Sequence, residues 1–142
     1  MRILVLNGPN LNLLGQRDPA RYGEKGMDGI LEGLRGHFPE HGIEEFRSNH
    51  EGDLIDALHR ADREFDGVVL NGGGYTHSSI ALGDAVEAIR VPVIEVHISN
   101  ILGREAFRHR SYIAPHAKGS IMGLGEDVYR LAVDHLLKLK DS

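Results

Sequence analysis

The sequence contains no cysteine and no apolar run long enough to cross a membrane. Without cysteine the chain cannot form a disulfide, a thiol nucleophile or a cysteine metal site, which favours a reducing compartment. A membrane helix needs about 18 consecutive apolar residues. The first apolar run, Ile3 to Leu6, is also too short for a secretory signal. We therefore expect a cytoplasmic protein with no membrane partner.

Basic residues are also not in excess. The chain has 16 Lys and Arg against 21 Asp and Glu, and its net charge of −5 argues against nucleic acid as a partner. Its apolar fraction of 41% is ordinary for a globular protein. A length of 142 residues corresponds to one domain. We expect residues 1–142 to form a single domain.

Short apolar segments alternate with segments of helical periodicity along the whole chain. The predicted strands are residues 3–6, 43–48, 67–70, 91–96 and 120–122. The predicted helices are residues 27–38, 54–65, 79–89 and 128–139, with a short charged helix near 103–108. Such alternation predicts a parallel sheet with helices on both faces. Five strands favour the flavodoxin-like doubly wound α/β fold, in which the strand order is 2-1-3-4-5.

The first predicted strand is followed by about 17 residues without clear periodicity. A loop of that length in a compact domain is typical of a lid or a binding loop. It begins at the carboxyl end of a strand, where doubly wound sheets bind their ligands. It also carries amides, guanidinium groups and a phenol. We interpret residues 11–25, approximately, as an active-site lid, and expect the loops after strands 1, 3 and 4 to converge beside it.

Residues 71–79 combine three consecutive glycines with hydroxyl side chains at a predicted strand-to-helix junction. Backbone N–H groups at such a junction form a ready anion site. The segment matches neither the phosphate-loop pattern nor the dinucleotide fingerprint. A carboxylate or hydroxyl clamp and a plain glycine-rich turn capped by Ser78 therefore both remain open.

His97 is the better catalytic candidate of the two histidines that follow buried strands, His77 and His97. Glu95 lies two residues earlier on the same face of the strand, where it can orient the imidazole. A purely structural histidine is the alternative. No histidine pair has metal-ligand spacing with a carboxylate, so we expect no metal.

Tyr22 is an unusual candidate for a base because an unperturbed phenol has a pKa of about 10. Arg17 and Arg21 nearby, or Arg104 and Arg108 from the later charged segment, would favour the phenolate by their charge. The alternative is a tyrosine whose ring anchors the loop. The residues alone favour the loop-anchoring role.

Three stretches together resemble the type II 3-dehydroquinate dehydratase family. They are residues 6–19 with Tyr22-Gly23, residues 71–81, and residues 94–100 with Arg104-Glu105 and Phe107-Arg108. The resemblance implies the flavodoxin-like fold argued above. It also implies a lyase that dehydrates 3-dehydroquinate to 3-dehydroshikimate, a step of the shikimate pathway and of quinate breakdown. No cofactor and no metal are implied.

The resemblance also implies how the reaction runs. A Tyr22 phenolate, kept ionised by Arg17, removes a proton from the carbon beside the ketone. A water bound to Asn10 holds the resulting enolate. His97, oriented by Glu95, then protonates the departing hydroxyl. A base and an acid on opposite sides of the ring suit an anti elimination.

The remaining family positions carry over as binding residues. Asn71, His77 and Arg108 would contact the ring hydroxyls, and Ile98 with Ser99 would hold the carboxylate. Asp84 resembles a residue that reaches into a neighbouring subunit's site, in a family that assembles trimers into a homododecamer. The segment from Glu24 to Gly29 departs from the family by lacking the threonine-leucine that opens the helix after the lid.

Three other functions remain to be weighed. The unrelated type I dehydratases use a lysine Schiff base, which needs a desolvated lysine. Here the lysines are Lys25, Lys118, Lys138 and Lys140, and none lies inside an apolar strand. A flavin- or nucleotide-binding module built on residues 71–79 would purify as a yellow protein if it held flavin. An inactive sensor of quinate-like acids would bind ligand without turnover.

Overall fold

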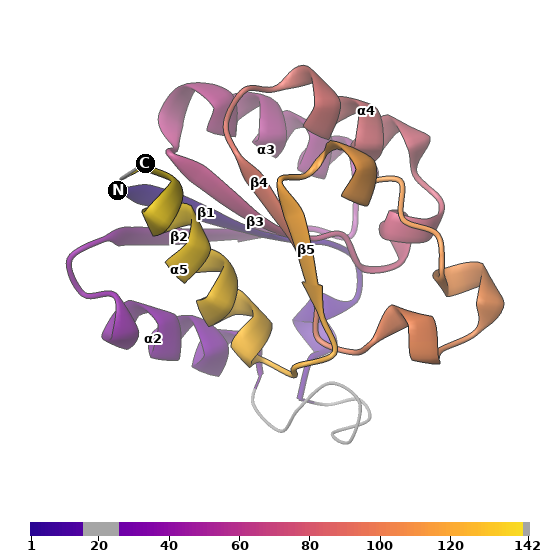
Figure 1. Cartoon of the computed structure of the whole chain (residues 1–142), viewed down its shortest axis with the longest axis horizontal. Coiled ribbons are helices and arrows are strands. Elements are labelled where there is room, and N and C mark those ends of the chain that lie inside the picture. Colours follow the sequence, from indigo (N-terminus) through magenta and orange to yellow (C-terminus); the bar gives the residue numbers. More distant parts are fainter. Residues whose placement is uncertain (16–25, 141–142) are drawn as a thin grey trace.

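The computed structural model describes residues 1–15 and 26–140. Its centre is a five-stranded parallel sheet with the order β2-β1-β3-β4-β5 (Figure 1). The strands are β1 (Arg2–Asn7), β2 (Gly42–Arg47), β3 (Gly67–Asn71), β4 (Val93–His97) and β5 (Gly119–Met122). The predicted fold class and strand order are therefore confirmed.

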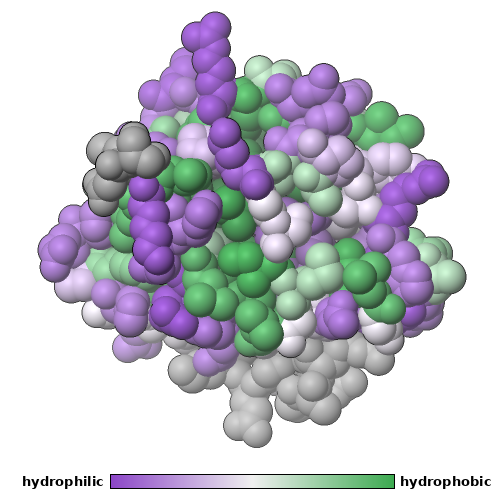
Figure 2. All heavy atoms as spheres, viewed as in Figure 1, coloured by the Kyte–Doolittle hydropathy of each residue, from purple (hydrophilic) through white to green (hydrophobic). Residues whose placement is uncertain are grey.

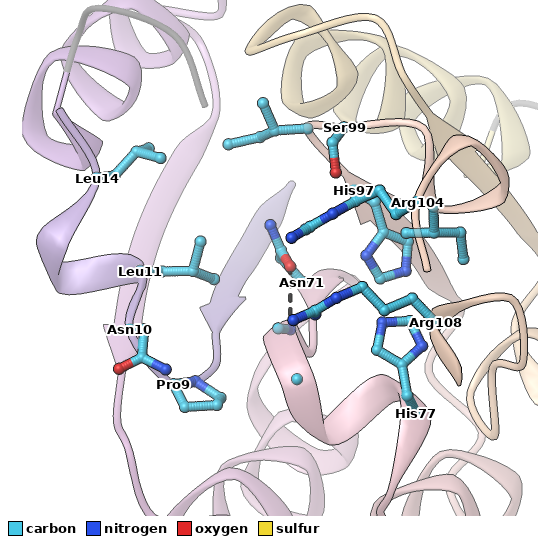
Figure 3. Close-up of a pocket in the computed structure, with 14 residues that line it drawn as sticks. Pro9, Asn10, Leu11, Leu14, Asn71, His77, His97, Ser99, Arg104 and Arg108 are labelled. Carbon is cyan, nitrogen blue, oxygen red and sulfur yellow. Dashed lines mark hydrogen bonds between the residues drawn. The ribbon is translucent and has the colours of Figure 1, made fainter. Parts of the chain in front are cut away.

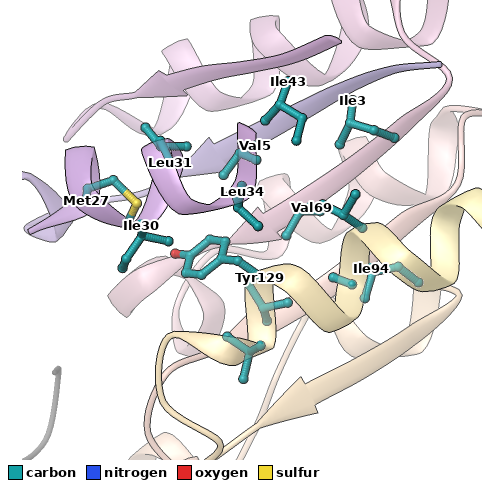
Figure 4. Close-up of a cluster of buried hydrophobic side chains, with 14 of the residues drawn as sticks. Ile3, Val5, Met27, Ile30, Leu31, Leu34, Ile43, Val69, Ile94 and Tyr129 are labelled. Atoms are coloured by element: carbon teal, nitrogen blue, oxygen red, sulfur yellow. The ribbon is translucent and has the colours of Figure 1, made fainter. Parts of the chain in front are cut away.

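Within the described residues, four α-helices cover the two faces of the sheet, as predicted. They are α2 (Met27–His37), α3 (Glu51–Glu64), α4 (Ile80–Ala88) and α5 (Asp127–Lys140). Helices α2 and α5 lie on one face and α3 and α4 on the other (Figure 1). Because successive strand residues point to opposite faces, β1 supplies Val5 to one buried cluster and Leu4 to the other. Figure 4 shows the first cluster, where Tyr129 reaches in from α5.

The strand register brings the polar loops to one edge of the sheet. Asn7, at the end of β1, is the register partner of Arg47 in β2 and of Asn71 in β3. His97 ends β4 opposite Met122 in β5. Because all five strands are parallel, the segments that follow β1, β3 and β4 leave the sheet at the same edge. This edge is where doubly wound folds bind ligands.

Two local predictions are wrong in detail. The charged segment near 103–108 forms no α-helix but two 3₁₀ turns, Ile101–Gly103 and Ala106–Arg108, because Arg104 and Glu105 between them have extended backbone angles. Residues Gly73–His77 also form a 3₁₀ turn. The cap of α4 is Ser79 and not Ser78, since the Ser79 hydroxyl accepts a 2.8 Å hydrogen bond from the Leu82 N–H.

Hydrophilic and hydrophobic residues are mixed on the face shown in Figure 2. Within residues 1–15 and 26–140, no helix combines the length and the apolar character needed to cross a bilayer.

Helix α2 carries a glycine whose replacement should stabilise the protein. Gly33 is exposed, and a Cβ atom there would meet nothing within 4 Å. Since glycine in a helix interior is about 0.5–1 kcal/mol less favourable than alanine, Gly33→Ala should raise the melting temperature by about 2–4 °C. Thermal unfolding followed by circular dichroism measures the change. Gly83→Ala in α4 is the opposite control. A Cβ atom at Gly83 would lie 2.3 Å from the Tyr112 carbonyl oxygen, so this substitution should lower the melting temperature.

Candidate active site

A pocket with a cavity of about 150 Å³ opens at the carboxyl edge of the sheet (Figure 3). A cavity of that size holds about one six-membered ring. Its described lining comes from the segments after β1, β3 and β4 and from the two turns that follow β4. These residues are Pro9, Asn10, Leu11, Leu14, Asn71, Gly73, Gly74, His77, His97, Ile98, Ser99, Ile101, Arg104 and Arg108.

Two of the lining segments are held together by a close backbone contact. The Gly8 N–H donates a 2.8 Å hydrogen bond to the Asn71 carbonyl, which joins the chain after β1 to the end of β3. A Cβ atom on Gly8 would lie 2.5 Å from the Gly72 carbonyl oxygen. Only glycine permits this approach without a backbone shift.

His97 and Glu95 form a buried pair behind the pocket. Side-chain exposure is 6% for His97 and 0% for Glu95, and His97 Nε2 lies 3.1 Å from Glu95 Oε2. Although this is ion-pair distance, Nε2 makes no well-directed hydrogen bond to any described residue. Glu95 also accepts hydrogen bonds from the Ser111 hydroxyl, at 2.5 Å, and the Ser120 hydroxyl, at 2.6 Å.

These contacts keep Glu95 ionised in a place where burial opposes it. Burial would raise the pKa of the Glu95 carboxyl, but His97 and the Ser111 and Ser120 hydroxyls together hold it below its ordinary value. A carboxylate 3.1 Å from Nε2 gives the His97 ring a charged partner on the side away from the pocket. The pair is therefore suited to deliver a proton to a ligand in the pocket.

Ser120→Ala removes one hydrogen bond to the Glu95 carboxylate and should destabilise the protein in a pH-dependent way. The carboxyl pKa is lowered by folding, so its stabilising contribution is present above the ordinary carboxyl pKa and is lost as pH falls through the native value. Without the Ser120 donor the native pKa moves back up, and the free energy of unfolding should fall by about 1.5 kcal/mol at pH 7. The difference in the free energy of unfolding between the variant and the wild type should become smaller below about pH 4.5.

Chemical denaturation of both proteins from pH 3 to 7 measures this difference. The same substitution in a Glu95→Gln background is the matched control, because the carboxyl is then absent. A pH-dependent difference that survives in that background would show that Ser120 does not act through Glu95.

His77 lies beside His97 with its ring nearly parallel to it. The two ring centroids are 6.2 Å apart at an interplanar angle of 25°. His77 Nδ1 lies 2.7 Å from the Arg110 carbonyl oxygen, which only accepts, so this nitrogen carries the proton. Burial is the main cause that lowers the pKa of His77, and the neighbouring charges of His97 and Arg108 add to it. A neutral His77 presents Nε2 as a hydrogen-bond acceptor.

The charged groups in the described lining are of one sign. Arg104 and Arg108 lie on the same side of the pocket as His77 and His97, opposite Leu11 and Leu14 (Figure 3). Glu105, outside the lining, pairs with Arg108 Nε at 2.8 Å. No Asp or Glu is among the described lining residues. The arrangement favours a small anionic ligand with one polar and one apolar side.

The structure brings together most of the predicted site residues that it describes. Asn10, Asn71, His77, His97, Ile98, Ser99 and Arg108 line the pocket. Glu95 lies directly behind His97. Asp84 is exposed on α4 and does not line the pocket of its own chain. Tyr22, Arg17 and residues 16–25 of the predicted lid lie outside the described residues.

Sequence reasoning missed the apolar side of the pocket. Leu11, Leu14 and Ile101 line it and are largely buried. The sequence does contain a signal for this side, because Leu11 and Leu14 are apolar residues in an otherwise polar loop and are expected to pack against other residues. Within the described part of the chain, no group of three His, Asp or Glu residues is placed to hold a metal ion.

Comparison with known proteins agrees with this architecture. A family model described as dehydroquinase class II matches residues 1–137. A 3-dehydroquinate dehydratase 1 from Corynebacterium efficiens is 56% identical over 137 residues, which cover 95% of this chain and 91% of its own. A 3-dehydroquinate dehydratase from Bacillus licheniformis is 55% identical over 139 residues, covering 95% and 94%. The crystal structure of type II dehydroquinase from Butyrivibrio crossotus matches with a TM-score of 0.93 at 41% identity, covering 96% and 97%.

Proposed function

The chain belongs to the dehydroquinase class II family, and from this premise we infer that it dehydrates 3-dehydroquinate to 3-dehydroshikimate, a step of the shikimate pathway. It is thus a hydro-lyase acting on a small molecule. The observation that carries the inference beyond family membership is the His97–Glu95 pair in the wall of a pocket sized for one ring. We propose that the elimination is anti and passes through an enolate.

His97 supplies the proton in the second half of the reaction. Hydroxide is a poor leaving group, so the C1 hydroxyl departs as water once it receives a proton. With Nε2 turned toward Glu95, Nδ1 is the ring nitrogen left to face the substrate. The Glu95 carboxylate stabilises the imidazolium before transfer and keeps the ring in one orientation.

Tyr22 and Arg17 are proposed as the base and its charge partner in the first half. The phenolate takes the C2 proton, and a water held by Asn10 donates to the enolate oxygen. Asn10 is at the pocket lining, with its backbone N–H bonded to Asn49 Oδ1 at 2.9 Å. Because Arg17 and Tyr22 lie outside the described residues, their roles and the lid over residues 11–25 stay predictions.

The other lining residues are proposed to hold the substrate. Its carboxylate binds at Ile98 and Ser99, on the cationic side of the pocket. Its ring hydroxyls contact Asn71, His77 and Arg108. A neutral His77 accepts a hydrogen bond, whereas Arg108 only donates, so the two distinguish the orientation of neighbouring hydroxyls.

We also propose that residues 1–142 act as one catalytic domain and that the chain assembles as trimers grouped into a cytoplasmic homododecamer. Asp84 supports the assembly, because an exposed carboxylate on α4 is available to a neighbouring copy and not to its own pocket. Light scattering with Asp84→Ala measures both the mass and its dependence on this residue. A wild-type monomer with full activity would contradict the proposed assembly.

A direct assay tests the proposed activity. The purified protein is mixed with 3-dehydroquinate, and the ultraviolet absorbance of the conjugated enone product is followed. We expect a steady rise that persists with chelator and after borohydride treatment in the presence of substrate, since neither a metal nor a lysine Schiff base is used. No rise from folded protein would favour the ligand-binding alternatives. A loss of activity on borohydride treatment would favour a Schiff base.

A further inference from the structure

A buried tyrosine outside the pocket is hydrogen-bonded to one of the pocket's polar residues. Tyr129, on α5, is 0% exposed, and its ring packs in the cluster between α2, α5 and the sheet (Figure 4). Its hydroxyl accepts a 3.0 Å hydrogen bond from Asn71 Nδ2 and donates one of 2.8 Å to Asn7 Oδ1. Asn7 and Asn71 are register partners at the ends of β1 and β3. The hydroxyl thus joins two adjacent strand ends.

The two ends of this chain of hydrogen bonds fix its direction. At one end the Gly73 N–H, which only donates, lies 3.1 Å from Asn71 Oδ1 (dashed in Figure 3). At the other end the Glu45 carboxylate, which only accepts, lies 3.0 Å from Asn7 Nδ2. Both amides are therefore oriented without ambiguity. Between them the Tyr129 hydroxyl must accept from one amide and donate to the other.

The hydroxyl is well suited to this double role. Burial raises the pKa of Tyr129 well above its ordinary value, so the group keeps its proton. The Glu45 carboxylate is itself held by Arg47 Nε at 2.9 Å, and Arg47 Nη2 reaches Asp28 Oδ1 at 2.7 Å. The chain therefore runs from the pocket through the core to the first turn of α2. Phenylalanine would fill the same apolar space but leave both asparagines without this partner.

We infer that Tyr129 is a positioning residue of the active site, whose hydroxyl orients the Asn71 amide toward the substrate. Asn71 Oδ1 is occupied by Gly73 and one Nδ2 proton by Tyr129. The second Nδ2 proton has no acceptor among the described residues and is the donor left for a ring hydroxyl of the substrate. This inference rests on the proposed function, which places Asn71 in the binding of that hydroxyl.

A double-mutant cycle tests whether Tyr129 acts through Asn71. Tyr129→Phe should lower kcat/KM by about 3- to 10-fold, the effect of one misplaced neutral hydrogen bond. Asn71→Ala should lower it at least as much. In the Asn71→Ala background, Tyr129→Phe should lower kcat/KM no further, because the group that it positions is gone. If the fold-losses of kcat/KM in the two single variants instead multiply in the double variant, the two residues act independently and the inference is overturned.

Val133→Ala is the matched control for lost stability. Val133 lies one turn after Tyr129 on α5 and is 0% exposed in the same cluster, but it makes no polar contact. We expect it to lower the melting temperature and leave kcat/KM unchanged. An equal loss of kcat/KM in Val133→Ala would show that general loosening of α5 is responsible. If Tyr129→Phe does not fold, Asn7→Ala removes the acceptor of its hydroxyl and enters the same cycle.

A readout without turnover separates this inference from the proposed activity. The side-chain amide resonances of Asn71, identified by their loss in Asn71→Ala, should shift in Tyr129→Phe and stay in place in Val133→Ala. Unchanged resonances in Tyr129→Phe would overturn the inference even if the wild type dehydrates 3-dehydroquinate. If the resonances shift but the wild type has no dehydratase activity, the positioning of Asn71 by Tyr129 is supported and the proposed function is rejected.

Discussion

Replacing His97 with alanine is expected to lower kcat for dehydration about 10²- to 10⁴-fold while the C2 proton of 3-dehydroquinate still exchanges with solvent. The two outcomes differ because His97 acts after the proton has been removed. Its imidazole is held 3.1 Å from the Glu95 carboxylate, and no other described histidine has a buried carboxylate beside it. Without His97 the enolate still forms, but the C1 hydroxyl has no acid to protonate it.

Proton NMR in heavy water follows the exchange, and the ultraviolet assay follows the dehydration in the same samples. His116→Ala is the control, since His116 faces the exposed Glu87 at 3.4 Å, outside the pocket, and should leave both rates unchanged. If exchange and dehydration vanish together while substrate still binds, His97 takes part in proton removal as well.

Tyr22→Phe should abolish both exchange and dehydration, with a loss of about 10²- to 10⁴-fold or more, and leave substrate binding largely intact. The phenol oxygen is the proposed base, and phenylalanine removes it while keeping the aromatic ring. Calorimetric binding of 3-dehydroquinate, measured together with the two rates, separates lost chemistry from lost affinity.

Tyr75→Phe is the matched control for Tyr22. The Tyr75 hydroxyl donates to the Asn49 carbonyl oxygen at 2.8 Å and does not line the pocket, so both rates should be retained. Normal activity in Tyr22→Phe would remove Tyr22 as the base. Exchange that continues without dehydration in this variant would assign proton removal to another group.

The sheet could be predicted from the sequence because its signals are local. The apolar run of β1 and the alternation of strands with helices are set by neighbouring residues, and the chirality of parallel connections limits the strand order. The same order brings the ends of β1, β3 and β4 together, so the meeting of Asn10, Asn71 and His97 at one edge followed from topology.

The other features of the fold and the site depend on contacts that are not visible in any local sequence pattern. Tyr129 occupies a position in the apolar stripe of α5, and nothing nearby in the sequence marks its hydroxyl as a partner of Asn7 and Asn71. The Ser111 and Ser120 donors to Glu95 come from the segment after β4 and from β5. The sequence predicts one short helix near residues 103–108, but two extended residues, Arg104 and Glu105, divide this segment into two turns.

The most direct test of the proposed mechanism is the stereochemistry of proton loss in the wild-type enzyme. Two samples of 3-dehydroquinate are needed, one carrying deuterium at C2 anti to the C1 hydroxyl and the other carrying it syn. A base and an acid on opposite sides of the ring predict complete loss of the anti deuterium and full retention of the syn deuterium in the product. Loss of the syn deuterium would contradict the proposal that His97 and Tyr22 act on opposite faces of the substrate.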